Sequence, residues 1–194
     1  MINLNLRLYA YAILGLGFGT YGLIFLLNQD LSSIDFQLAL RDASLAITLN
    51  IIIWGVFVKW LWKWKGFYGW LVPFPNLAGN WIGEINSNWE GAENPISTEI
   101  NINQTFFHIT VRLKTGESES ISNAASFDID PNRKVSRLFY SYMNTPKPTL
   151  RDRSQIHYGT TLLNFDGYPV TELTGEYWTS RESTGEIRLK KKEV

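Results

Sequence analysis

The chain contains no cysteine and only two histidines, His108 and His157, among its 194 residues. Without cysteine there is no disulfide, no thiolate ligand for a metal and no cysteine nucleophile. Two histidines are too few for a multi-histidine metal centre, and they are a poor starting set for the base of an enzyme active site. We therefore expect no catalytic residues, no metal site and no cofactor.

An excess of basic residues is also missing, because 18 lysines and arginines are balanced by 18 aspartates and glutamates. Proteins that bind long nucleic acids gain affinity by releasing counterions through many basic contacts. The balance makes a nucleic acid polymer a poor candidate for a partner. A compact anion held in a pocket is compatible with it.

Two stretches near the N-terminus lack charged residues altogether. The first, residues 8–29, is long enough as a helix to cross a bilayer core, which needs about 20 apolar residues. The second, residues 43–58, is short by itself, but Lys59 and Lys63 can extend their charged ends toward the headgroups. The sequence predicts transmembrane helices at about 8–28 and 43–62. A cleaved signal peptide is the weaker alternative for the first stretch, because the apolar run is too long and no small-residue cleavage site follows it.

Basic residues flank this predicted pair of helices, and acidic residues dominate the connection between them. Arg7 precedes the first helix, and Lys59, Lys63 and Lys65 follow the second. The connection contains one arginine and three acidic residues, Arg41, Asp30, Asp35 and Asp42. Short cytoplasmic flanks of membrane helices carry an excess of lysine and arginine. We therefore expect residues 1–65 to form an anchor with both termini of the chain, and the domain that follows, in the cytoplasm.

Three glycines of the first apolar stretch, Gly15, Gly19 and Gly22, recur at helical spacings of four and three residues. A row of small residues lets another helix backbone approach closely in a membrane. The sequence therefore predicts helix association on this face. The partner is either the second helix of the same chain or a helix of another chain, and the spacing does not choose between them.

After a connection rich in glycine and proline, residues 66–75, the pattern changes from helical to strand-like. Residues 76–194 contain short runs in which apolar and polar residues alternate, separated by turn residues such as glycine, proline, aspartate and asparagine. We expect strands at 77–85, 97–104, 106–114, 118–130, 135–144, 156–165, 172–181 and 183–191. The fold class predicted for the whole chain is two N-terminal transmembrane α-helices followed by an all-β, roughly eight-stranded antiparallel barrel, since closure removes exposed strand edges. Such a barrel has room inside for side chains or one small ligand.

The alternation also predicts which side chains face the barrel interior. Phe107, Ile109, Val111 and Leu113 are apolar and alternate with polar residues, so this set is expected to point inward, and His108 outward. In two segments, 77–81 and 173–177, a leucine, a glycine and an aromatic residue share one face. We expect the glycine to leave room beside the aromatic ring, as part of barrel packing.

Aromatic and hydroxyl side chains gather in two of the predicted strands. Tyr140 and Tyr142 share one face of the first, and Tyr177, Thr179 and Arg181 share one face of the second. Rings of this kind stack on a nucleobase, and a guanidinium donates paired hydrogen bonds to a phosphate. The sequence predicts a ligand site at these residues. A solvated Arg181 beside a turn is the alternative.

The loop from residue 144 to residue 155 is basic and contains Arg151. We include Arg151 among the candidate ligand-binding residues, because this loop can close over an anionic ligand. An ordinary solvated loop, or a contact with anionic lipid headgroups, explains the same charges.

Four segments together resemble a known family: Leu77-Ala78-Gly79-Asn80-Trp81, residues 138–142, residues 173–181 and Gly185-Glu186-Ile187-Arg188-Leu189. With the two helices, they make the chain similar to the bacterial two-transmembrane β-barrel effectors of CBASS anti-phage defence. The resemblance implies that a cyclic dinucleotide, made by a partner nucleotidyltransferase, binds the barrel. It also implies that the protein then forms a homo-oligomer in the lipid bilayer of the inner membrane, disrupts that membrane and kills the infected cell.

Three other functions are compatible with parts of the sequence. A membrane-tethered barrel that holds a lipid or other apolar molecule, without a death function, would have a pocket lined only by apolar side chains. An enzyme would need a nucleophile and base or a metal, for which the chain has few candidates. A purely structural subunit would bind no ligand.

Overall fold

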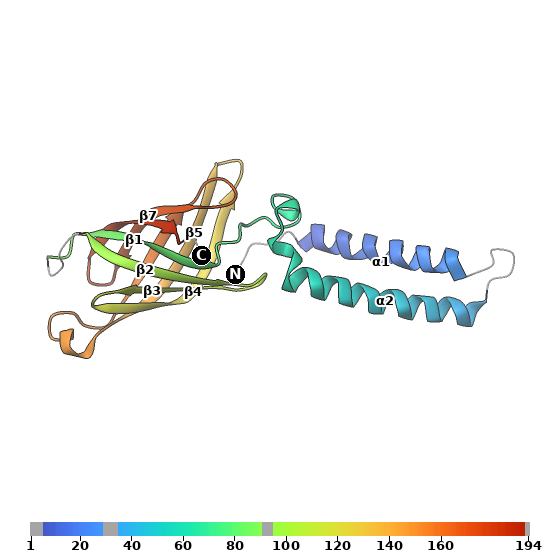
Figure 1. The fold of residues 1–194 in the computed structure, drawn as a ribbon, viewed down its shortest axis with the longest axis horizontal. Helices are drawn as coiled ribbons and strands as arrows, with labels where there is room; N and C mark the ends of the chain where they lie inside the picture. Colours follow the sequence, from blue (N-terminus) through green and yellow to red (C-terminus); the bar gives the residue numbers. More distant parts are fainter. Residues whose placement is uncertain (1–5, 29–34, 91–94, 193–194) are drawn as a thin grey trace. The chain divides into compact units, whose positions relative to one another are not determined.

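The computed structural model describes residues 6–28, 35–90 and 95–192, and these form two compact units. One unit spans Leu4–Val72, and the other is built from Pro73–Val194. The first contains two long helices and two short 3-10 helices, and the second contains eight strands (Figure 1).

The two long helices are α1, Leu6–Asn28, and α2, Phe36–Lys59. Both are long and apolar enough to cross a membrane, as the sequence predicts. Helix α2 begins seven residues before the predicted start at residue 43 because Asp35 caps it: the Asp35 carboxylate accepts hydrogen bonds from the backbone N–H groups of Gln37 and Leu38, at 2.8 and 3.2 Å. It also ends earlier than predicted, and the chain continues in two single-turn 3-10 helices, η1 (Leu61–Lys63) and η2 (Lys65–Phe67).

Polar side chains join α1 to α2. The Asn50 amide donates to the Thr20 hydroxyl at 2.7 Å, and the Asn28 amide donates to the buried carboxylate of Asp42 at 2.8 Å. A hydrogen bond between apolar helices replaces the water that these groups would otherwise need, so the two contacts set the register of the pair.

The glycine face of α1 takes no part in this pairing. A Cβ atom built on Gly15, Gly19 or Gly22 meets no heavy atom of the described chain within 4 Å, apart from the nearby backbone of its own helix. The α1–α2 contact therefore lies on another face, and association of the glycine face with a further chain stays a prediction.

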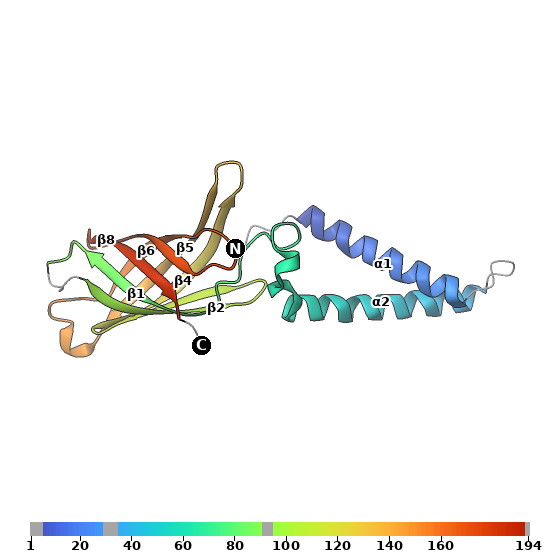
Figure 2. The same cartoon turned by 45° about the horizontal axis from the view of Figure 1, so that its top comes forward.

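The eight strands form a closed barrel in which each strand pairs antiparallel with the next, and β8 pairs with β1 (Figure 1). The predicted architecture is confirmed. The strands are β1 (Gly79–Ser87), β2 (Ile96–Gln104), β3 (Ile109–Thr115), β4 (Ser118–Asp130), β5 (Val135–Pro146), β6 (His157–Asn164), β7 (Glu172–Thr179) and β8 (Thr184–Lys191). Strand β4 is bulged between Ser122 and Ala124, and the long β4–β5 hairpin stands out from the barrel wall (Figure 2).

The inward set predicted for β3 is correct from Ile109 onward and wrong at Phe107. Ile109, Val111 and Leu113 are buried, whereas Phe107 is 53% exposed. The reason is a turn that precedes the strand: the backbone N–H of Thr105 donates to the His108 carbonyl at 2.8 Å, so the alternation has not yet begun at Phe107. His108 is exposed, as expected.

One end of the barrel is filled by apolar side chains. Phe74, from the segment that leads into β1, stacks on Phe127 with ring centroids 5.5 Å apart, and Phe106 and Phe165 complete the cluster. The buried side chain of Gln104 bridges the same segment to β2: it accepts from the N–H of Leu77 at 2.7 Å and donates to the carbonyl of Pro75 at 2.9 Å. We call this the closed end.

Candidate ligand-binding site

A cavity of about 630 Å³ occupies the other end of the barrel. Its lining comes from the last residues of the odd-numbered strands, the first residues of the even-numbered strands and the connections between them. This size falls within the range of small-molecule pockets, about 300 to 1,000 Å³. We call this end of the barrel the open end.

Tyr140 and Tyr142 lie side by side on β5, and both line the cavity. Their ring centroids are 5.9 Å apart and the rings are tilted by 47°. Burial raises the pKa of Tyr140 to about 12, and burial together with the neighbouring tyrosines raises the pKa of Tyr142 still further. Both phenols therefore stay protonated at physiological pH and offer a ring surface with a neutral hydroxyl.

Glycines of the adjacent strands make room for two tyrosine rings of the site, those of the buried Tyr142 and the half-buried Tyr177. Tyr142 pairs with Gly159 and Tyr177 pairs with Gly185 across the sheet. A Cβ atom on Gly159 would lie 2.4 Å from the Tyr142 hydroxyl oxygen, and one on Gly185 would lie 2.7 Å from the Tyr177 ring. Each ring therefore lies against a glycine, and it can hold this position because glycine has no side chain.

The two glycines that the sequence assigns to this purpose have other neighbours. A Cβ atom on Gly175 would meet the backbone oxygen of Leu162 at 1.8 Å, so this glycine lets β6 and β7 approach closely. Gly79 adopts a positive φ of 126°, and its nearest neighbour is the side chain of Lys191. Neither Trp81 nor Tyr177 is among the nearest neighbours of these two glycines, so the expected room beside the rings is not found there; the Tyr177 ring lies against Gly185 of β8 instead.

Hydroxyl groups form a second part of the lining. The Tyr177 hydroxyl donates to Ser87 Oγ at 2.6 Å, and Thr179 Oγ1 lies 2.6 Å from Ser183 Oγ. The backbone N–H of Arg181 donates to Thr179 Oγ1 at 3.2 Å, which positions the arginine just after the end of β7. These contacts join β7 to β1 and β8 at the open end.

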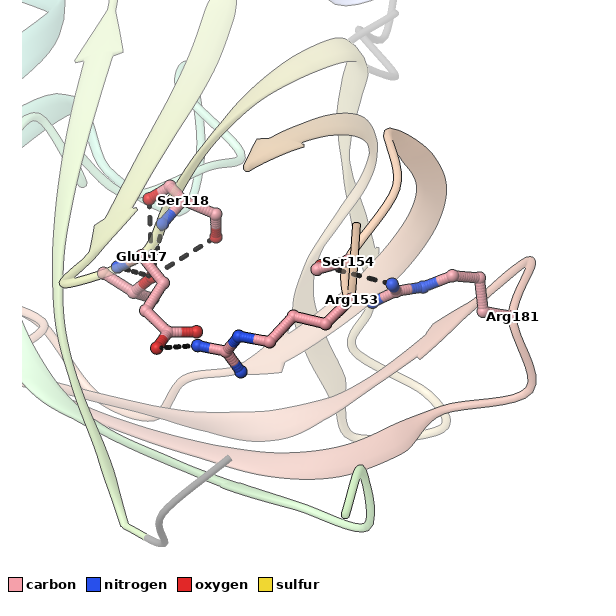
Figure 3. Close-up of polar contacts among 6 residues, drawn as sticks. Glu117, Ser118, Arg153, Ser154 and Arg181 are labelled. Carbon is pink, nitrogen blue, oxygen red and sulfur yellow. Dashed lines mark hydrogen bonds and ion pairs between the residues drawn. The ribbon is translucent and has the colours of Figure 1, made fainter. Parts of the chain in front are cut away.

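The Arg181 guanidinium lies at the cavity among uncharged partners. Its Nη1 donates to Ser154 Oγ at 3.2 Å (Figure 3). Its Nη2 lies 3.5 Å from His157 Nε2. His157 Nδ1 lies 2.9 Å from the carbonyl of Gln155, so the ring donates there and accepts from Arg181 through Nε2. The buried Nε of Arg181 has no hydrogen-bond partner within the described part of the chain.

Burial, and then the positive charge of Arg181, lower the pKa of His157 below its usual 6.5, opposed by the hydrogen bond to Gln155. The imidazole is therefore neutral at physiological pH. It acts as an acceptor that orients Arg181 and adds no second charge to the cavity.

A second arginine, Arg153, lines the same cavity and pairs with Glu117 of the β3–β4 turn (Figure 3). The guanidinium carbons of Arg153 and Arg181 lie 5.7 and 5.5 Å from the ring centroid of Trp89. Cations over a tryptophan ring are attracted by its quadrupole. Trp89 therefore gathers both arginines at the mouth of the cavity.

The structure brings five of the six predicted ligand-binding residues to this cavity: Tyr140, Tyr142, Tyr177, Thr179 and Arg181. Arg151 is not among the lining residues, because it follows the 3-10 helix η3 (Pro148–Leu150) and its Nε points to the carbonyl of Pro146, 3.5 Å away. Arg153, two residues further along, lines the cavity in the place predicted for Arg151.

Sequence reasoning missed several lining residues, among them Trp89, Glu117, Arg153, Ser154 and His157. Four of them lie in connections, where no alternation reports the direction of a side chain. His157 is the exception, since it is the first residue of β6. It is an even number of residues from the apolar Leu163, so alternation predicts that both side chains point inward.

Chemically, the open end combines tyrosine rings, hydroxyls and two guanidinium groups. It suits a ligand that has a flat ring system and a phosphate, since the rings can stack and each guanidinium can donate a pair of hydrogen bonds. No group of three or more histidine, aspartate or glutamate side chains placed to hold a metal ion occurs among the residues that the structure describes.

Comparison with known proteins assigns the barrel to a family. Residues 72–191 match the family model described as Cap15, cyclic dinucleotide receptor domain. The chain is 30% identical over 151 residues to CD-NTase-associated protein 15 of Staphylococcus schleiferi, an alignment that covers 76% of this chain and 78% of the relative.

Proteins of the same name from two other bacteria give similar alignments. The relative from Escherichia albertii is 26% identical over 148 residues, covering 75% of this chain and 74% of the relative. The one from Yersinia aleksiciae is 32% identical over 135 residues, covering 70% and 62%. The resemblance to the CBASS effectors is therefore confirmed, and the chain belongs to the Cap15 family, whose receptor domain is its β-barrel.

Proposed function

We propose that this chain is a membrane-anchored receptor and effector of anti-phage defence. A cyclic dinucleotide, made by a partner nucleotidyltransferase during infection, binds in the open-end cavity. The liganded protein assembles into a homo-oligomer and disrupts the inner membrane, which kills the infected cell. The barrel and both termini face the cytoplasm, where the nucleotide is made, and the protein performs no catalytic step of its own.

The observation that carries this proposal is the chemistry of the cavity inside the segment that matches a cyclic dinucleotide receptor domain. Tyr140, Tyr142 and Tyr177 supply ring surface for bases, and Arg181, with Thr179 beside it, supplies donors for a phosphate. A pocket built for a lipid would be lined by apolar side chains, whereas this one contains two arginines, a histidine and several hydroxyls.

Ligand binding changes the assembly state only if the ligand has a higher affinity for the assembled form. The helical unit offers a surface for that assembly, since the glycine face of α1 is not used within one chain. Close packing of this face against a second chain would join anchor helices in the bilayer.

The ligand is tested by titrating the full-length protein in detergent micelles with cyclic di-AMP, cyclic di-GMP and cyclic GMP–AMP. Binding is read by calorimetry and by thermal shift, with the matching linear dinucleotides as controls. We expect saturable binding of one cyclic species and much weaker binding of its linear form. If none of these nucleotides binds and an apolar molecule is recovered from the purified protein, a lipid-binding barrel would be favoured instead.

The assembly surface is tested by Gly19→Leu, which adds a large side chain to the glycine face. We expect the variant to bind ligand normally but to lose most of the ligand-induced oligomer, because the two backbones can no longer approach. Oligomer size is measured in micelles by mass photometry, and killing is measured by growth after induction. Ala10→Leu is the matched control, since residue 10 is exposed on a different face of α1. Unchanged oligomer size in Gly19→Leu would remove the glycine face from the proposal.

A further inference from the structure

Three of the described residues that line the cavity are charged: Arg153, Arg181 and Glu117. All three lie at the mouth, where both arginines approach Trp89. The two arginines nevertheless differ in what balances their charge. This difference leads to an inference that rests on the proposed function and extends it.

Arg181 is available to an anion. Its partners, Ser154 and His157, are neutral, no carboxylate in the described chain forms an ion pair with it, and its Nε has no hydrogen-bond partner there. A phosphate that enters the cavity finds a half-buried arginine whose buried Nε has unused donor capacity. Charge-assisted hydrogen bonds of this kind are the stronger ones in proteins.

Arg153 already has an anion. Its Nη2 pairs with Oε1 of Glu117, and about half of each side chain is exposed, 43% and 48%. Exposed ion pairs contribute about 0.2–1 kcal/mol, so an incoming phosphate can replace the carboxylate at small cost.

The backbone around Glu117 is held in place independently of this ion pair. The Glu117 carbonyl accepts from the N–H of Lys147 at 2.9 Å, and its own N–H donates to Thr115 Oγ1 at 3.3 Å. Ser118 then pairs with Pro146 at the start of the β4–β5 ladder. The carboxylate can therefore leave Arg153 by a rotation of its side chain, without opening the turn.

We propose that Glu117 is a specificity-determining residue that occupies Arg153 in the empty receptor and yields it to the second phosphate of a ligand. A ligand with one phosphate is satisfied by Arg181 and leaves the Arg153–Glu117 pair intact. A ligand with two phosphates gains the second arginine after Glu117 is displaced. Arg153 therefore adds affinity only for a ligand with two phosphates, and Glu117, by competing for Arg153, sets the size of that gain.

The test is a double-mutant cycle on the full-length protein in micelles, with Glu117→Gln, Arg153→Ala and the double variant. The probes are the cyclic dinucleotide that binds in the panel above, 3′,5′-cyclic AMP and inorganic pyrophosphate. We expect Glu117→Gln to tighten dinucleotide binding by about two- to five-fold, the equivalent of an exposed ion pair, and Arg153→Ala to weaken it. In the Arg153→Ala background, Glu117→Gln should have no effect. Binding of cyclic AMP should change less than binding of the dinucleotide.

Glu119→Gln is the matched control, because Glu119 lies two residues further along on β4, pairs with Arg112 at 3.3 Å and is not a lining residue of the cavity. It removes the same charge and should leave dinucleotide affinity unchanged. If Glu117→Gln tightens binding equally with and without Arg153, Glu117 acts by simple repulsion and the inference is wrong. Weaker or unchanged dinucleotide binding in Glu117→Gln would mean that the Arg153–Glu117 pair only stabilises the structure, and would also overturn the inference.

Failure of the proposed function gives a different result. If the unmodified protein binds none of the cyclic dinucleotides, the receptor function fails. The affinity for pyrophosphate, measured in all three variants, still tests the Arg153–Glu117 pair. Tighter pyrophosphate binding in Glu117→Gln, absent without Arg153, would support the displacement of Glu117 by a phosphate. Equal pyrophosphate binding in every variant would overturn it.

Discussion

The closed and open ends lie at opposite ends of the same eight strands, but they are lined by different side chains. At the closed end, Phe74, Phe106, Phe127 and Phe165 pack against one another, and the buried amide of Gln104 is hydrogen-bonded to the backbone of Leu77 and Pro75. At the open end, the strands and their connections present tyrosines, hydroxyls and arginines around a cavity of about 630 Å³.

Within this one small domain, the closed end mainly stabilises the fold and the open end provides the groups that can bind a ligand. Buried aromatic side chains contribute area removed from water, which stabilises the fold without specifying a ligand. Partly buried arginines and hydroxyls cost desolvation unless they are paired, and at the open end a ligand can supply the partners. Mutations at the two ends should therefore affect different measurements.

The largest effect on stability is expected from Phe127→Ala at the closed end. Phe127 is 6% exposed and contacts the rings of both Phe74 and Phe165. Its removal should lower the free energy of unfolding by about 3–5 kcal/mol, because the cavity it leaves is only partly refilled. Chemical denaturation of the full-length protein, followed by tryptophan fluorescence, measures the change.

Ligand affinity in Phe127→Ala should remain close to that of the unmodified protein under native conditions. Phe107→Ala is the control, since Phe107 belongs to the turn beside the same cluster but is 53% exposed. A large loss of affinity with little loss of stability would mean that the closed end also belongs to the ligand site.

The opposite pattern is expected for Arg181→Ala at the open end. Loss of its charge-assisted hydrogen bonds should weaken dinucleotide binding by about ten- to a hundred-fold, because such bonds contribute about 1.5–3 kcal/mol. Calorimetry gives the affinity, and thermal shift without ligand gives the stability, which should change little.

Arg188→Ala is the matched arginine for this comparison. Arg188 lies on β8, and its side chain is 66% exposed. It pairs with Glu186 at a distance of 3.6 Å and is not a lining residue of the cavity. It should keep full affinity. Equal affinity in Arg181→Ala and Arg188→Ala would remove Arg181 from the site.

The strands of this barrel could be predicted because alternation and turn chemistry agree along most of the chain. Residues 118–130 are an example, since the predicted strand and β4 have the same bounds. Predictions failed where a local contact overrides the pattern: the Asp35 cap starts α2 early, and the Thr105–His108 turn delays β3.

The candidate site could be predicted in part for a topological reason. Tyr142 lies near the end of β5 and Arg181 follows β7, and the ends of odd-numbered strands meet at one rim of an up-and-down barrel. Trp89, Glu117 and Arg153 could not be placed in this way. They lie in the connections, where direction depends on contacts between segments distant in sequence, such as the Glu117–Arg153 pair.

The smallest effect is a pH dependence at the open end. Since the pKa of His157 in the folded barrel is below its usual 6.5, the unfolded chain binds more protons as the pH falls through that value. Stability is therefore complete above about pH 6.5 and decreases below it, with a slope of at most about 1.4 kcal/mol per pH unit for one proton. In the folded protein, a protonated His157 would face the Arg181 guanidinium, 3.5 Å away, and lose its role as acceptor.

Denaturation of the ligand-free protein between pH 7.5 and 5.5 measures this slope. His157→Gln should reduce it, because the glutamine amide can accept from Arg181 without taking up a proton. His108→Gln, which changes an exposed histidine beside the closed end, controls for the loss of a histidine as such. If the slope persists in His157→Gln, another group is responsible, and the neutral histidine no longer distinguishes the open end from the closed one.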